Sequence, residues 1–225
     1  MNFTLRSRAI VEFGGTAFLL MAVVGSGIMA ERLAAGNVAL ALLANSIATG
    51  AALVALILAL GPISGAHLNP VVTLADAMQG GIAWSEVPVY IAMQIAGAFG
   101  GVAGAHLMFG LPIFFASHHA RSGRAQIGSE FIATFGLLAV IWGCARVHSQ
   151  AVSFAAGAYI AAAYWFTSST SFANPAVVLA RAASDTFAGI RPVDAPAFIA
   201  AQIAATLTAM VCFRWLAGET TEPSL

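Results

Sequence analysis

The sequence predicts an all-α integral membrane protein, built as one bundle of six transmembrane helices and two re-entrant half helices. Three observations support this prediction. The 225 residues are 60% hydrophobic and only 8% charged. Apolar runs long enough to cross a bilayer recur along the whole chain. Two short segments built around an Asn-Pro pair interrupt these runs, one in each half of the sequence.

Six apolar runs approach or exceed the length of a membrane span, about 20 residues for a bilayer core about 30 Å thick. Two arginines precede the first run, as in a signal peptide. That run is too long for a signal peptide's apolar core and contains Glu12, so we expect a retained first helix. The runs cover residues 9–30, 37–60, 87–110, 127–146, 151–166 and 195–217.

Charge and cysteine content exclude several classes of protein. Soluble domains carry about 25% charged residues, so a surface with so few charges is expected to face lipid. Nine arginines balance nine acidic residues and there is no lysine, which leaves no basic field for nucleic acid. Cys144 and Cys212 lie in apolar runs, where a free buried thiol is favoured over a disulfide or a metal site. We expect no cofactor and no metal.

The two Asn-Pro segments, residues 64–79 and 168–184, are expected to start short helices at membrane depth. Asparagine is a favoured N-cap residue, and proline is favoured at the first helical position. Asn69 and Asn174 therefore cap helices of about 11 residues and roughly 16 Å, about half the thickness of a bilayer core. Placed end to end, the two helices can cross the whole bilayer.

The two halves of the chain repeat each other. The segment 88–96 recurs as 196–204, the Asn-Pro pairs lie 105 residues apart, and the sequence around Glu12 is echoed around Glu130. Each half holds three spans, an odd number, so the second half must enter the membrane in the opposite orientation. We expect one domain over residues 1–225, with inverted repeats at about 1–116 and 126–225. Such folds place their solute path near the midplane.

The backbone carbonyls of residues 64–68 and 168–173, just before each half helix, cannot all accept hydrogen bonds within a helix. We expect this backbone to line a watery cavity with hydrogen-bond acceptors. The positive helix ends, each equivalent to about half an elementary charge, meet at the centre and oppose cations and protons. If the oxygen of each asparagine caps its helix, the amide nitrogen offers two donors to the lumen. This arrangement suits neutral hydroxyl solutes.

On these residues the chain resembles the aquaporin, or major intrinsic protein, family over nearly its whole length. The resemblance implies an aquaporin-like right-handed bundle, a homotetramer with one channel per subunit, and two Asn-Pro-Ala boxes at the channel centre. Two positions depart from the family pattern: Val71 stands in place of alanine, and Val177 stands where the family usually has arginine. The boxes are Asn69, Pro70, Val71 and Asn174, Pro175, Ala176.

By alignment to the boxes, the family's outer constriction falls on Thr49, Ala162, Ser171 and Val177. All four are uncharged and small or medium in size, so we expect a wide ring that admits solutes larger than water. Glycerol-facilitating relatives carry an aspartate at the position of Val178. The pattern without arginine resembles a bacterial branch associated with arsenic resistance, which implies passage of neutral metalloid hydroxides such as arsenous acid.

Other polar residues receive mainly structural assignments. The resemblance implies that Glu12 and Glu130 hold the re-entrant loops, which we favour over a proton relay. For His67, loop packing and pH gating both stay open. Arg181 is expected to anchor a loop, one turn too far along to replace the missing arginine. The polar stretch 117–125, with its paired histidines, is interpreted as a solvated loop.

The favoured function is a passive channel for water, polyols and arsenite in the inner (plasma) membrane, with both termini in the cytoplasm. Arginine counts of four against five leave this orientation undecided by charge. The alternatives are a general water and glycerol facilitator and an alternating-access transporter. A transporter would need a titratable group near the midplane besides the two glutamates. The sequence has neither the zinc and nucleophile motifs of an enzyme nor the acidic ring of a cation channel.

Overall fold

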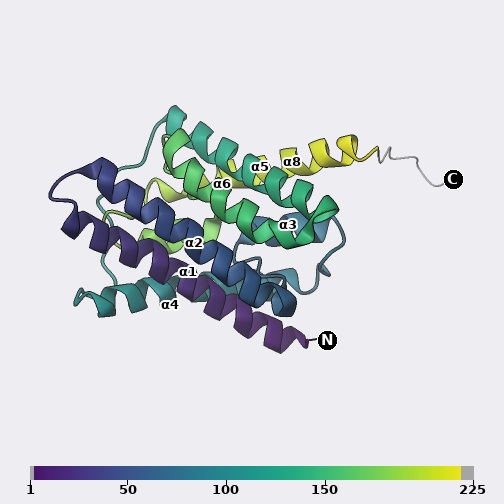
Figure 1. Ribbon diagram of the computed structural model, residues 1–225, viewed down its shortest axis with the longest axis horizontal. Helices are drawn as coiled ribbons and strands as arrows, with labels where there is room; N and C mark the ends of the chain where they lie inside the picture. The colour runs from purple at the N-terminus through teal and green to yellow at the C-terminus, as the bar shows by residue number, and fades with distance from the viewer. Residues whose placement is uncertain (1–2, 219–225) are drawn as a thin grey trace.

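The computed structural model describes residues 3–218, and this part of the chain is all helical apart from one isolated β-bridge (Figure 1). Six long helices surround two short ones. The helices are α1 Leu5–Leu33, α2 Val38–Ser64, α3 Pro70–Met78, α4 Val87–Met108, α5 Arg124–Val147, η1 Ser149–Ala151, α6 Val152–Phe166, α7 Pro175–Arg181 and α8 Ala195–Leu216.

The predicted fold class is confirmed. Helices α1, α2, α4, α5 and α8 are each long and apolar enough to cross a membrane. Helix α6 has only 15 residues, but it packs along α2 and α5 and is extended at its start by the 3-10 turn η1. The two half helices are shorter than the 11 residues expected, with nine residues in α3 and seven in α7.

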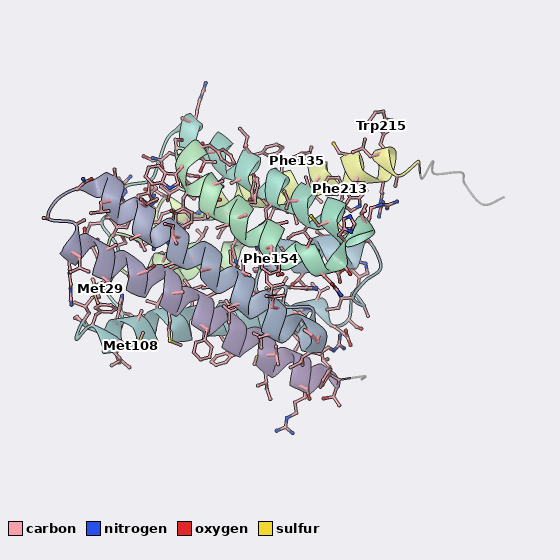
Figure 2. All side chains as sticks on the ribbon, viewed as in Figure 1. Met29, Met108, Phe135, Phe154, Phe213 and Trp215 are labelled. Carbon is pink, nitrogen blue, oxygen red and sulfur yellow. The ribbon has the colours of Figure 1, made fainter. Side chains whose placement is uncertain are left out.

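Two ends of the bundle can be distinguished in Figure 1. Helix α1 begins and α8 ends at one end, which we call the terminal end. At the opposite end, which we call the loop end, α1 turns into α2 and α4 passes through residues 109–123 into α5. Figure 2 places Met29 of α1 and Met108 of α4 at the loop end. Helix α3 runs from the centre toward the terminal end, and α7 runs toward the loop end.

The outer surface of the bundle is apolar over much of its area. Phe154 on α6 and Trp215 near the end of α8 are both more than half exposed (Figure 2). Soluble monomers rarely expose large contiguous apolar patches, whereas a helix in a bilayer must present apolar side chains to lipid. The surface therefore agrees with an integral membrane protein.

Glycines on α4 allow its backbone to approach that of α1. A Cβ atom added at Gly97 would collide with the carbonyl oxygen of Phe13, and one added at Gly101 would collide with that of Ala17. These glycines follow the small-xxx-small spacing that brings membrane helices together. The structure assigns these two positions to helix packing within the chain.

We expect Gly101→Ala to destabilise the protein by about 1–3 kcal/mol, because the new methyl group overlaps backbone atoms that cannot rotate away. It would also lie 2.6 Å from Leu20 Cβ. Gly100→Ala is the matched control, since its Cβ meets only the ring of Phe13, at an ordinary contact distance of 3.5 Å or more. Thermal unfolding in detergent measures both variants. Equal unfolding temperatures would contradict the close-packing explanation.

Candidate channel

The two half helices are joined tip to tip by a reciprocal pair of hydrogen bonds. Asn69 Nδ2 donates to the carbonyl oxygen of Ala173 at 2.8 Å, and Asn174 Nδ2 donates to that of Leu68 at 2.9 Å. Each asparagine also caps its own helix: Asn69 Oδ1 accepts from Val71 N, and Asn174 Oδ1 accepts from Ala176 N. Pro70 and Pro175 occupy the first helical positions behind these caps.

These bonds correct one detail of the sequence-based geometry. Each side-chain amide has two N–H groups, and one of them is used in the bond to the opposite loop. One N–H per asparagine is therefore left for a solute, rather than two. The same bond fixes the direction of the remaining N–H, because the amide group is planar.

The backbone before each half helix adopts an unusual conformation. Ala66 and Leu68 in the first loop have φ values of 46° and 50°, and Ser171 and Ala173 in the second have 50° and 47°. Non-glycine residues rarely occupy this left-handed region, so the surrounding contacts must hold them there. All four residues line the central cavity. They keep their loops out of the α-helical conformation, which leaves backbone carbonyls available to the lumen.

Two buried glutamates supply much of that support. Glu12 accepts from the backbone N–H groups of His67 at 3.0 Å and Leu68 at 2.7 Å. Glu130 accepts from those of Phe172 and Ala173, both at 2.9 Å. The two sites are equivalent positions of the repeat, and each carboxylate lies against the re-entrant loop of its own half.

A glutamine that was not among the residues expected from the sequence completes each of these sites. Gln94 Nε2 donates to Glu12 at 2.8 Å, and Gln202 Nε2 donates to Glu130 at 2.7 Å. Both glutamines are fully buried. They stand at the same place in the repeated segments 88–96 and 196–204, so an amide retained in both copies was the signal that could have identified them.

A single cavity of about 430 Å³ runs along the two half helices. Asp76, Gln79 and Arg146 line it toward the terminal end, and Arg181 lines it toward the loop end. Asn69 and Asn174 both contribute to its wall between these ends. The asparagines, the left-handed loops and the half helices therefore surround one continuous space.

The structure brings three of the four expected constriction residues to this cavity and excludes the fourth. Thr49, Ser171 and Val177 line it, whereas Ala162 lies exposed on the outer surface of α6. Tyr164 takes the place expected for Ala162. Two residues along a helix differ by about 200° in direction, so the alignment across the loop pointed to the wrong face of α6.

Tyr164 changes the expected shape of the constriction. Its hydroxyl lies 3.2 Å from Thr49 Oγ1, within hydrogen-bond distance across the cavity wall. The expected ring of small and medium side chains is therefore corrected to a ring with one large aromatic member. The wide opening inferred from four small or medium side chains no longer follows.

His67 lies beside the cavity on the terminal side of Asn69. Its Nδ1 is 3.1 Å from Thr73 Oγ1, and its Nε2 is 3.6 Å from a carboxylate oxygen of Asp76. The ring also packs against Tyr90. These contacts support a role in packing the loop, and they place the side chain where its charge would face Asp76.

The polar stretch between α4 and α5 is only partly solvated, which corrects its interpretation as a free loop. His118 is exposed, and its hydrogen bonds hold the pKa of Asp185 below the usual range. Arg121, in contrast, is only 7% exposed. It donates to the carbonyl oxygens of Gly189 at 2.7 Å and Ser169 at 3.2 Å. The stretch folds back over the loop end of the bundle.

Arg181 is fully enclosed at the same end. It donates through Nε to the carbonyl oxygen of Ala188, which agrees with the loop anchor expected from the sequence. It also lines the cavity together with Val177. A guanidinium group therefore stands in the cavity wall in addition to the two positive helix ends.

Comparison with known proteins agrees with this geometry. Residues 2–151 match the Major intrinsic protein family. The chain belongs to the major intrinsic protein family. It is 52% identical to a Rhizobium meliloti protein named aquaglyceroporin AqpS, over 96% of this chain and 92% of that one.

More distant members of the major intrinsic protein family share less of their length or sequence with this chain. A rice protein named Aquaporin NIP1-3 is 34% identical over 77% of this chain, and the match spans 64% of the rice protein. The crystal structure of an aquaglyceroporin from Plasmodium falciparum shares the fold, with a TM-score of 0.69 at 22% identity, covering 94% of this chain and 96% of that one.

Proposed function

We propose that this protein is a passive channel for water and small uncharged hydroxyl solutes, including polyols and arsenous acid. As a member of the major intrinsic protein family it is a channel and not an enzyme. The resemblance to aquaglyceroporin AqpS supports solutes larger than water. Arsenous acid is uncharged at neutral pH and presents hydroxyl groups much as glycerol does, so the same donors serve both.

One observation carries the proposal: Asn69 and Asn174 lie in the wall of one cavity, and each keeps one amide N–H that the loops do not use. A neutral hydroxyl accepts a hydrogen bond from either donor. A cation meets donors and two positive helix ends instead of acceptors. The centre therefore favours neutral solutes over cations.

The remaining assignments follow from this proposal. Pro70, Val71, Pro175 and Ala176 complete the two boxes, and Thr49, Ser171, Val177 and Tyr164 form the selectivity constriction. Glu12, Glu130 and His67 support the loops. We further propose a multi-pass protein of the inner membrane, with both termini in the cytoplasm, that assembles as a homotetramer with one channel in each subunit.

Purified protein in liposomes tests the function. We expect osmotic water permeability above that of empty vesicles, glycerol and arsenous acid fluxes linear in solute concentration, and no dependence on a proton or sodium gradient. Stopped-flow light scattering measures water and glycerol, and trapped arsenic measures arsenous acid. Flux that saturates and follows an ion gradient would favour an alternating-access transporter. If water and glycerol pass but arsenous acid does not, the protein is a general water and glycerol facilitator.

A further inference from the structure

The loop end of the cavity holds a charged side chain, Arg181, although the position next to the second Asn-Pro-Ala box is a valine. Val177 and Arg181 are four residues apart on α7, and both line the cavity. Residues four apart share one face of a helix, with a rise of about 6 Å between them. Arg181 therefore continues the cavity wall one turn nearer the loop end than Val177.

The direction of α7 turns the Arg181 side chain back toward the constriction. Side chains on a helix lean toward its N-terminus, and the N-terminus of α7 lies at the centre of the protein beside Asn174. A long side chain at position 181 thus extends toward the space that an arginine at position 177 would occupy. Valine at 177 is small enough to leave that space open.

The guanidinium of Arg181 is held rigidly. Its Cζ lies 3.5 Å from the centroid of the Phe172 ring, and its Nε donates to the carbonyl oxygen of Ala188. The backbone N–H of Phe172 is itself held by Glu130. The side chain is only 2% exposed, and no carboxylate among the described residues forms an ion pair with it.

The two buried arginines at the loop end, Arg121 and Arg181, differ in their hydrogen bonds. Arg121 uses Nε, Nη1 and Nη2 on carbonyl oxygens of Gly189, Ser169 and Phe187, and it does not line the cavity. The two terminal nitrogens of Arg181 have no hydrogen-bond partner in the part of the chain that the structure describes. The guanidinium group of Arg121 is hydrogen-bonded to the loops, whereas the terminal N–H groups of Arg181 are left to interact with a solute in the lumen.

We propose that Arg181 is the specificity-determining cation of the outer constriction, and that it performs from one helical turn away the function of an arginine at position 177. Its charge opposes cations and protons, and its terminal N–H groups orient hydroxyl solutes opposite Thr49 and Tyr164. This inference rests on the proposed channel function. It explains how the position after the second Asn-Pro-Ala box can be a valine without leaving the channel open to cations.

Variants of Arg181 in liposomes test the proposal, with proton leak followed by an internal pH dye and water permeability by light scattering. Arg181→Met is expected to raise proton leak roughly tenfold or more while water still passes. Arg181→Lys keeps the charge but loses the planar Nε–H, and it is expected to keep the leak near wild type. If the methionine variant does not fold, Arg181→Gln carries the same expectation.

Arg121→Met is the matched control, since it removes another buried arginine that also faces the Phe172 ring. It is expected to lower thermal stability without raising proton leak. Leak that stays at the wild-type value in both neutral Arg181 variants would overturn the proposal. Equal leak in the lysine, methionine and Arg121 variants would also overturn it, because loop anchoring alone predicts that result. Absence of water permeability in wild-type vesicles would instead refute the channel function.

Discussion

Val177→Arg is expected to lower permeability to glycerol and arsenous acid roughly tenfold or more, with a smaller loss for water. The new side chain enters the cavity that Thr49 and Tyr164 also line, and its bulk takes up part of the space there. It also lies one turn from Arg181, and two guanidinium groups in a low-dielectric wall repel each other. At least one of them must then turn into the lumen.

Val177→Leu is the control that distinguishes the effect of side-chain size from the effect of charge, because it adds one carbon and no charge. We expect it to reduce glycerol flux only slightly. Liposomes with matched amounts of each protein give the three permeabilities directly. Unchanged arsenous acid flux in Val177→Arg would contradict the placement of Val177 in the constriction.

Glu130→Gln is expected to abolish most solute flux and to destabilise the protein by about 1–3 kcal/mol. Three N–H donors converge on this carboxylate, from Phe172, Ala173 and Gln202. A glutamine keeps one acceptor oxygen and sets its own NH₂ group against a donor. At least one buried N–H then has no partner, and the left-handed conformation of the second loop loses its support.

The repeat supplies a second variant for this prediction. Glu12→Gln is expected to have a similar effect, because Glu12 accepts from His67 and Leu68 in the same way. Glu31→Gln is the control, since Glu31 is exposed near the end of α1. Thermal unfolding in detergent and glycerol flux in liposomes measure all three. Wild-type flux in both buried variants would contradict the loop-support role.

Much of the fold could be predicted from the sequence, because its main determinants are local. Span length, the Asn-Pro caps and the repeated segments each act within a few residues, and the bilayer thickness sets the rest. The same local chemistry placed Asn69 and Asn174 at helix starts. The repeat then indicated that the two starts face each other, as their reciprocal hydrogen bonds show.

The residues of the constriction were less predictable than the fold, because they depend on the rotation of each helix about its axis and on the paths of the loops. Alignment to the Asn-Pro boxes selected Ala162, whereas Tyr164, two residues further on and on the opposite face of α6, lines the cavity. The composition of the polar stretch 117–125 carried no sign that Arg121 would fold inward. For Arg181, the four-residue spacing indicated its face but not the reach of its side chain.

The reciprocal bonds between the half helices have a consequence for biosynthesis. Leu68 and Asn69 emerge from the ribosome more than one hundred residues before their partners Ala173 and Asn174. Until the second half is translated, the Leu68 carbonyl and the Asn69 side-chain amide lack the hydrogen-bond partners that the second loop provides. The two bonds between the loops can therefore form only after α7 and the loop before it have been synthesised.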